Sequence, residues 1–207
     1  RERGVEYIEV RCMDLDPFEP VGIAAPTLRF LDVFLLHCLL SDSPPDTPDE
    51  IAALGRNQHR TASHGREPGL KLERMGHEVG LVDWGQEIIE QCAPIAAALD
   101  ALHGTRDYSA ALAAGREGLA QLDSLPSARV LAAMHSDFAD SYTGFIKSQA
   151  VQTRQQLMAA PWAAEEQARY ERLAQASIEQ RNAVEAADTV DFETFRQAYL
   201  APERLVV

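Results

Sequence analysis

From Asp83 to its last residue the sequence is almost continuously helical in character, which limits the chain to a mainly α fold. Helix-breaking residues occur there at few places: near Gly104, at 124–126, near Pro161 and near Asp188. The stretch 107–180 is rich in Ala, Gln, Arg, Glu and Leu, a composition typical of packed helices. Its apolar residues keep no seven-residue repeat, and the Ser-Tyr-Thr-Gly run at 141–144 interrupts them. We therefore predict a helical bundle here in place of a long coiled coil.

Two further helices are predicted in the first third of the chain. Pro26 suits a first helical turn, and apolar residues on most faces follow it to residue 40, so this helix should be largely buried. The Thr-Pro-Asp-Glu motif at 47–50 is a capping box that opens a second helix, ending near residue 64. The Gly, Pro and charged residues of 65–80 favour a loop or a short hairpin.

The clearest strand pattern covers Val5 to Val10, where β-branched or aromatic residues fill four of six positions and the two faces alternate. The sequence thus predicts a mainly α (α+β) fold of six to eight helices with one or two strands. It divides into residues 1–25, which hold the strand and a proline-rich turn, and a helical region at 26–207.

Charge and hydropathy exclude several classes of partner. The net charge of −13 repels phosphate backbones and anionic lipids, so we expect no nucleic-acid or membrane partner. The best apolar run, 30–40, is interrupted by Asp32 and His37 and is too short to span a bilayer. Three cysteines without a CxxC pair indicate reduced thiols and a cytoplasmic protein. The absence of a starting Met leads us to expect a piece of a longer protein.

The predicted strand carries the best candidates for chemistry, Glu9 and Arg11. Being two residues apart, they project from one face of a strand, about 7 Å from each other. A carboxylate can hold Mg²⁺ through oxygen, and an arginine can bind phosphate oxygens with two parallel hydrogen bonds. The spacing alone favours the alternative, an ordinary surface ion pair across the pleat.

Arg60 and Arg66 are weaker candidates for anion binding. They lie six residues apart across a predicted helix end, beside a glycine-containing turn where a cation can hold phosphate. Such arginines more often cap a helix C-terminus or form ion pairs. We retain Arg66 as a candidate nucleotide contact. His59 and His64 are five residues apart, which does not match the spacing of a helical metal-binding pair.

The segment from Arg3 to Arg11, Arg-Gly-Val-Glu-Tyr-Ile-Glu-Val-Arg, resembles the proteobacterial type of glutamate–cysteine ligase. Similar blocks follow in the family's order: 14–18, 20–23, 29–34, 65–70, 127–131 and 185–189. The resemblance covers nearly the whole chain but only roughly the last two-fifths of the family's length, so it identifies a carboxy-terminal part.

This resemblance implies a catalytic sheet related to that of glutamine synthetase, to which the strand at 5–10 would belong. ATP would phosphorylate the γ-carboxylate of L-glutamate, and the amine of L-cysteine would attack the acyl phosphate, the first step of glutathione biosynthesis. The family's roles make Glu9 a ligand of Mg²⁺ and place Arg11 against the nucleotide phosphates. The remaining metal ligands and the amino-acid pockets belong to the family's amino-terminal part, so we expect the fragment alone to be inactive.

Two other functions fit parts of the sequence. A non-catalytic helical interaction or assembly domain would explain the acidic, alanine-rich helices without using Glu9 or Arg11. Another ATP-dependent carboxylate–amine ligase would keep both residues and change only the amino acids that are joined. An enzyme fragment should leave the strand without a partner and Glu9 open, whereas a helical module should lack the strand or cover it.

Overall fold

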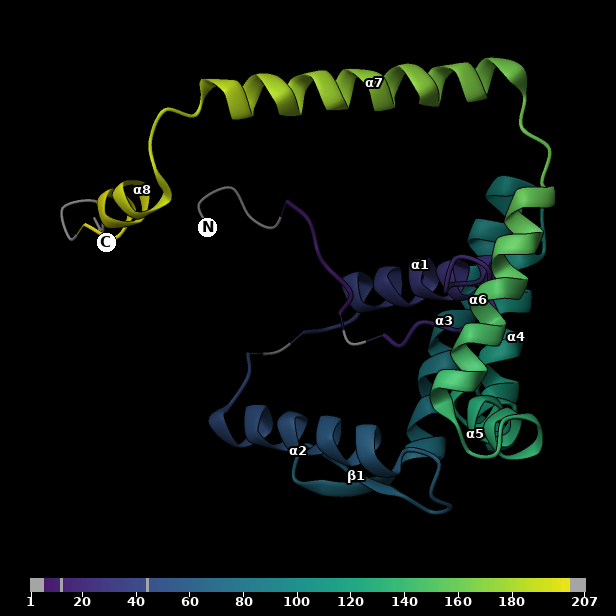
Figure 1. The fold of residues 1–207 in the computed structure, drawn as a ribbon. Helices are drawn as coiled ribbons and strands as arrows, with labels where there is room; N and C mark the ends of the chain where they lie inside the picture. The colour runs from purple at the N-terminus through teal and green to yellow at the C-terminus, as the bar shows by residue number, and fades with distance from the viewer. Residues whose placement is uncertain (1–5, 12, 44, 202–207) are drawn as a thin grey trace. The chain divides into compact units, whose positions relative to one another are not determined.

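The computed structural model describes residues 6–11, 13–43 and 45–201, and within them the mainly α fold is confirmed (Figure 1). Its helices are α1 Ala25–Leu40, α2 Pro48–His64, α3 Leu81–His103, α4 Asp107–Ala120, α5 Pro126–Asp137, α6 Tyr142–Ala159, α7 Ala164–Ala187 and α8 Phe192–Tyr199, with a 3-10 turn at Leu122–Ser124. The strands are β1 Lys71–Arg74 and β2 His77–Gly80. The chain divides into two compact units, Arg1–Leu157 and Met158–Val207, which are described separately below.

Local sequence signals place the first helices and the hairpin correctly. Helix α1 begins with Pro26 in its first turn, and α2 begins at Pro48. The hydroxyl of Thr47 accepts a hydrogen bond from the backbone N–H of Glu50 at 3.2 Å, which is one half of the predicted capping box. The strands pair antiparallel through a tight turn in which Met75 and Gly76 both have positive φ, as two-residue hairpin turns require.

The strand predicted at 5–10 does not form over the residues described. Val5 and Cys12 lie outside the described residues, and residues 6–11 belong to neither helix nor strand. A strand is stabilised by hydrogen bonds to a neighbouring strand, and within the described parts of the chain the only paired strands are β1 and β2. The alternating pattern therefore lacks the partner that would turn it into a strand.

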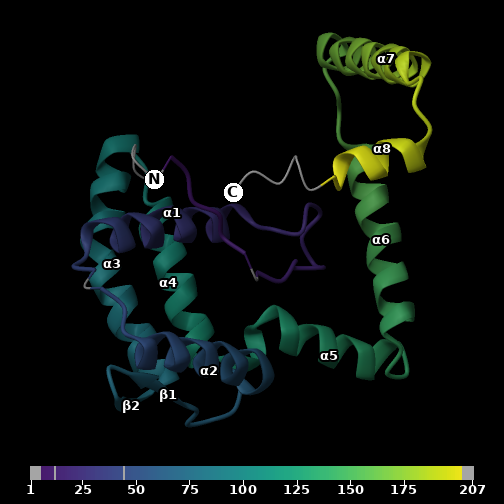
Figure 2. The same cartoon turned by 90° about the vertical axis from the view of Figure 1, so that its left-hand side faces the viewer.

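The hydrophobic core of the first unit lies where α1, α3 and α4 pack together, with α1 lying across the other two helices (Figure 2). Its buried residues are Val33, Ile89, Cys92, Ala96 and Leu112. The expectation that α1 is largely buried is wrong. Only Val33 is fully buried on this helix, while Leu39 and Leu40 are 76% and 72% exposed. The core contacts one face of α1, and no described element covers its last turn.

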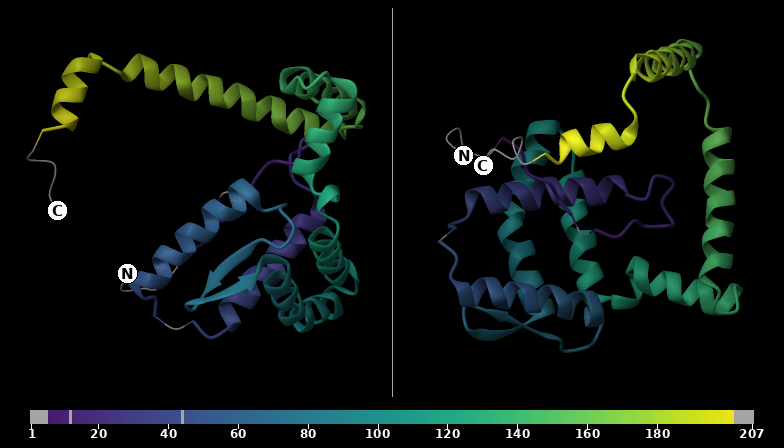
Figure 3. Two further views of the ribbon diagram at one scale, coloured as in Figure 1. Left: turned by 90° about the horizontal axis from the view of Figure 1, so that it is seen from below. Right: turned by 60° about the vertical axis from the view of Figure 1, so that its left-hand side comes forward.

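The hairpin is held beside α2 by polar contacts that converge on Glu73 (Figure 3). The buried side chain of Asn57 donates to the Glu73 carbonyl at 2.7 Å and accepts from the Glu73 N–H at 2.8 Å. It thus provides the backbone of Glu73 with the hydrogen bonds that a neighbouring strand would make on that edge of β1. The guanidinium groups of Arg56 and Arg60 both contact the Glu73 carboxylate. The hydrogen bond from Arg56 lowers the pKa of Glu73 below its ordinary value. These contacts fix the loop that joins α2 to the hairpin.

Asp100, near the end of α3, caps the start of α4. Its buried carboxylate accepts hydrogen bonds from the backbone N–H groups of Tyr108 at 2.9 Å and Ser109 at 3.0 Å. Burial by itself raises the pKa of Asp100, but the hydrogen bonds from Ser109 and Tyr108 outweigh it, and the pKa lies below its ordinary value. The ionised carboxylate is therefore the form that holds the two helices together.

We expect Asp100→Asn to destabilise the chain at neutral pH and to lose much of this effect in acid. Because folding lowers the pKa of Asp100, its stabilisation is complete above the unfolded pKa of about 3.9 and disappears as the pH falls through the lower folded pKa. Thermal unfolding should show a melting temperature about 2–4 °C lower at neutral pH. Near pH 3.5 the difference should shrink, since the Asp100 carboxylate of the unfolded chain is then largely protonated. The exposed Asp123→Asn serves as the control, and an equal difference at both pH values would contradict the assignment.

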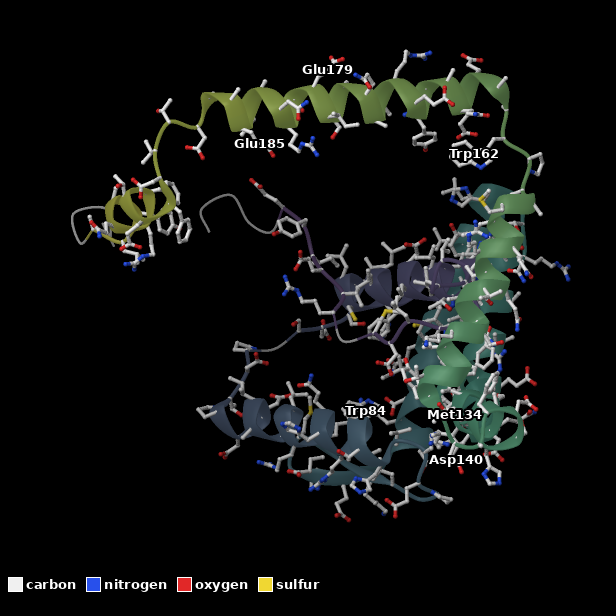
Figure 4. All side chains as sticks on the ribbon, viewed as in Figure 1. Trp84, Met134, Asp140, Trp162, Glu179 and Glu185 are labelled. Atoms are coloured by element: carbon white, nitrogen blue, oxygen red, sulfur yellow. The ribbon has the colours of Figure 1, made fainter. Side chains whose placement is uncertain are left out.

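The second unit consists of helices that bury no residue of their own. Around α7 the side chains, Glu179 and Glu185 among them, project outward on every side (Figure 4). Trp162 is 56% exposed, and its ring lies beside that of Tyr170, with ring centroids 5.3 Å apart. Helix α8 likewise has no buried residue. The predicted bundle is therefore limited to α4 with α1 and α3, and α7 is not part of a packed bundle within its unit.

Candidate functional site

Glu9 and Arg11 lie side by side in the structure and form an ion pair. The Nε atom of Arg11 donates to Oε2 of Glu9 at 2.7 Å, and Nη2 contacts the same oxygen. The side chains are 79% exposed for Arg11 and 50% exposed for Glu9. An ion pair this exposed contributes little to stability, so separating it costs little. The carboxylate can therefore exchange the guanidinium for a metal cation, and the guanidinium can exchange the carboxylate for a phosphate.

The segment around the pair is neither paired nor covered. Tyr7 and Ile8 are 76% and 61% exposed, and residues 6–11 have no strand beside them among the described residues. The segment thus shows one feature expected of a helical module and one expected of an enzyme fragment. No strand forms, as a helical module requires, but Glu9 stands open, as an enzyme fragment requires.

A closed turn follows the pair and fixes where the segment joins the rest of the first unit. The N–H of Asp16 donates to the carbonyl of Gly22 at 2.9 Å, and the Asp16 carboxylate accepts from the N–H of Phe18 at 2.9 Å. The Phe18 ring packs against Phe145 of α6, with ring centroids 5.6 Å apart. Phe145 is completely buried. Along the chain, this turn follows Glu9 and Arg11 and is held to α6 by the contact between Phe18 and Phe145.

Arg66 lies on an open pocket of about 990 Å³ at the end of α2. The lining residues are Asp14, Asn57, Gln58, Thr61, Ala62, Ser63, His64, Gly65, Arg66, Glu67 and Ser127. The pocket offers hydroxyl groups and the half-buried residue Arg66, which suit an anion, together with the carboxylates of Asp14 and Glu67, which oppose one. Asp14, three residues after Arg11, lines the same pocket, but no contact joins Arg66 to Glu9 or Arg11 among the described residues.

The structure separates the two arginines that the sequence placed together. Arg60 forms an ion pair with Glu73 at 3.0 Å, so its charge is used within the fold. For Arg66, no ion pair is recorded in the described part of the chain. Ser127 and Asp14 also line the pocket, and no local sequence pattern identifies them as pocket residues, although both lie in blocks that resemble the ligase family.

Glu9 can be one ligand of a divalent cation but not the whole site. Mg²⁺ needs near-octahedral coordination by oxygen, usually from one or two carboxylates with water and substrate phosphates. Among the residues that the structure describes, no group of three or more His, Cys, Asp and Glu side chains gathers in one place. The site present in this chain therefore fits a metal only as a partial set of ligands.

The comparisons with known proteins agree with one another. The family model described as glutamate-cysteine ligase matches residues 1–61. A glutamate–cysteine ligase of Janthinobacterium sp. (strain Marseille) is 44% identical over 197 residues, which cover 95% of this chain and 37% of that protein. A glutamate–cysteine ligase of Pseudomonas fluorescens (strain Pf-5) is 40% identical over 199 residues, covering 96% of this chain and 37% of its own length.

A solved structure is similar in fold as well. The crystal structure of the Francisella tularensis glutamate–cysteine ligase in complex with AMP matches with a TM-score of 0.79 and 28% sequence identity, covering 95% of this chain and 39% of that chain. The chain thus spans about 37% of the length of the curated relatives that it matches. These matches confirm the resemblance drawn from 3–11. Within the described residues, no helix is long and apolar enough to cross a membrane.

Proposed function

We propose, from a relationship to the glutamate–cysteine ligases that runs along nearly its whole length, that this chain is the carboxy-terminal part of such an enzyme. The intact protein would join L-glutamate, through γ-glutamyl phosphate, to L-cysteine with hydrolysis of ATP. The observation that carries the proposal is 44% identity over 197 residues to a ligase of this kind. The AMP in the crystal structure of a similar protein supports an adenine nucleotide as ligand.

In this proposal, residues 1–25 join the catalytic sheet of the intact protein and 26–207 form its helical region. A neighbouring strand would supply the hydrogen bonds that residues 6–11 lack here, so the alternating pattern could become a strand. On a strand, Glu9 and Arg11 would keep a common face. The intact protein would be cytoplasmic, and its acidic charge argues against nucleic-acid partners.

Glu9 and Arg11 would act by holding charge in place. The carboxylate of Glu9 would bind a Mg²⁺ ion, which neutralises negative charge on the phosphates during transfer. The guanidinium of Arg11 would donate two hydrogen bonds to phosphate oxygens, in a geometry that a planar fork provides. Arg66 would add a further phosphate contact from its pocket, supported by its half-buried position and the absence of a recorded ion pair in the described residues.

The two alternative functions have less support. Another ATP-dependent carboxylate–amine ligase would use Glu9 and Arg11 in the same way, but the relatives reported above are all glutamate–cysteine ligases. A purely helical interaction domain would not require similarity that extends through residues 1–61, the part that carries the charged pair.

The test is whether nucleotide turnover depends on both amino acids. We expect the intact protein that contains this chain to release ADP from Mg²⁺-ATP only when L-glutamate and L-cysteine are both present, and to form γ-glutamylcysteine. The 207-residue chain alone should release none under the same conditions, because it holds only a partial set of metal ligands. Coupled release by the chain alone, or turnover of the intact protein with other amino acids in place of these two, would contradict the proposal.

A further inference from the structure

We propose that Arg129 of α5 is a positioning residue that clamps the turn after Glu9 and Arg11 onto α5 and α6. The role in turnover rests on the proposed function, whereas the clamp itself is a feature of the first unit. Arg129 is far from the pair in sequence and contacts neither member of it. Its effect on chemistry would come through the turn at 14–22.

Arg129 makes two different contacts with that turn. Its guanidinium carbon lies 4.0 Å from the centroid of the Phe18 ring, within the range of a cation–π contact. Its Nη1 atom lies 3.9 Å from the carboxylate of Asp16, whose side chain is only 22% exposed. One guanidinium thus contacts two residues of the turn, a ring and a carboxylate.

Phe18 also contacts an aromatic cluster. Phe145, which is completely buried, packs against Phe18 with ring centroids 5.6 Å apart and against Phe138 at 5.8 Å. Tyr142 contributes a third ring at 6.4 Å. Phe18 contacts both this cluster and Arg129, so loss of the guanidinium would remove one of the two ring contacts found for Phe18 among the described residues.

Backbone hydrogen bonds within the turn link its residues, so a contact made by Phe18 or Asp16 affects the position of the whole turn. Asp16 bonds to Gly22 across the turn, and the N–H of Gly22 donates to the carbonyl of Glu19 at 3.0 Å. Gly22 has φ of 76°, a left-handed conformation that a residue with a Cβ would adopt only with strain, so a substitution there would disturb the turn. Residues 6–11 have no strand beside them in the described part of the chain, so their position depends on this turn. Misplacing a reacting group by about 1 Å can cost on the order of 10²-fold in rate.

The test compares Arg129→Met with Arg116→Met in the intact protein. Arg116 on α4 is a matched control, since its side chain is 47% exposed, close to the 46% of Arg129, and it pairs with Glu90 at 3.4 Å, while no cation–π contact of Arg116 is found among the described residues. We expect Arg129→Met to raise the Mg²⁺ concentration for half-maximal activity and the KM for ATP by about 10-fold or more, because Glu9 and Arg11 would be held less accurately. Arg129→Lys keeps the charge without the planar group and should lie between Arg129→Met and wild type. Arg116→Met should stay within about twofold of wild type.

Two outcomes would overturn the clamp. A variant that merely unfolds in part would lose active protein but keep the wild-type Mg²⁺ and ATP dependence, so unchanged half-saturation values in Arg129→Met contradict the positioning role. Hydrogen exchange of the peptide covering 13–22 gives a second reading that needs no activity. We expect faster exchange in Arg129→Met than in Arg116→Met, because the hydrogen-bonded amides of the turn lose their support. Equal exchange in both variants would contradict the clamp even if the intact protein proved not to be a ligase.

Discussion

Glu9→Gln in the intact protein is expected to raise the Mg²⁺ requirement and to lower kcat by about 10²- to 10³-fold, the cost of losing one charge-stabilising group in a transition state. The amide keeps the shape of the carboxylate but loses the negative charge that holds a hard cation. The side chain is half exposed and pairs only with Arg11 in the described residues, so the variant should fold normally. Steady-state kinetics over a Mg²⁺ titration, with circular dichroism for folding, measure both effects.

Glu6→Gln is the matched control for this change. Glu6 lies in the same exposed segment, three residues before Glu9. Its substitution by Gln removes the same charge from the chain. If Glu9 is a metal ligand, Glu6→Gln should leave the Mg²⁺ dependence close to that of wild type. Similar losses in both variants would show that the effect comes from the net charge of the segment, and a wild-type titration curve for Glu9→Gln would remove Glu9 from the metal site.

Arg11→Lys should do almost as much damage as Glu9→Gln, with a loss of about 10²-fold or more in kcat/KM for ATP. Lysine keeps the positive charge but has no planar fork, so two parallel hydrogen bonds to phosphate oxygens become impossible. Arg11 is 79% exposed, so its loss removes no packing from the core. The kinetics should be measured across an ATP titration at saturating Mg²⁺, which separates phosphate binding from metal binding.

The control for Arg11→Lys is Arg116→Lys, which makes the same chemical change at an exposed ion pair on α4. We expect it to behave like wild type. If Arg11→Lys also kept wild-type kinetics, Arg11 and Glu9 would be an ordinary surface ion pair, which is the form in which they are seen here.

Elements fixed by neighbouring residues could be predicted from sequence. The capping motif at 47–50 sets the start of α2 because its hydrogen bond joins residues three apart. The break between α5 and α6 has a similar origin. The Asp140 N–H donates to the Met134 carbonyl at 2.9 Å, and the Ser141 hydroxyl accepts from the Gly144 N–H at 3.1 Å, which starts α6 (Figure 4). The sequence showed this break only as a polar run at 141–144.

Features that depend on distant residues could not be predicted. The alternation at 5–10 favours a strand, but a strand also needs a partner, and residues 6–11 have none in the described chain. The apolar faces of α1 indicated burial, yet Leu39 and Leu40 are open. Helix periodicity shows which side chains prefer burial and not what covers them.

The candidate site also has features that follow from neighbouring residues and features that depend on distant ones. The spacing of Glu9 and Arg11 correctly indicated that the two side chains can meet, because it follows from neighbouring residues. Arg60 and Arg66 looked equivalent in sequence, and only the hairpin distinguishes them, since Glu73 pairs with Arg60. The contact of Arg129 with Phe18 joins residues more than a hundred positions apart, and no local pattern predicts it.

The most direct measurement is a crystal structure of the intact protein with Mg²⁺ and a non-hydrolysable ATP analogue. The ion pair between Glu9 and Arg11 should then be broken. A Glu9 carboxylate oxygen should lie about 2.0–2.1 Å from Mg²⁺, and the Arg11 guanidinium should lie about 2.7–2.9 Å from phosphate oxygens. If Glu9 and Arg11 stayed paired with each other, as they are in this chain, while other residues held the metal and the phosphates, the proposed site would be wrong.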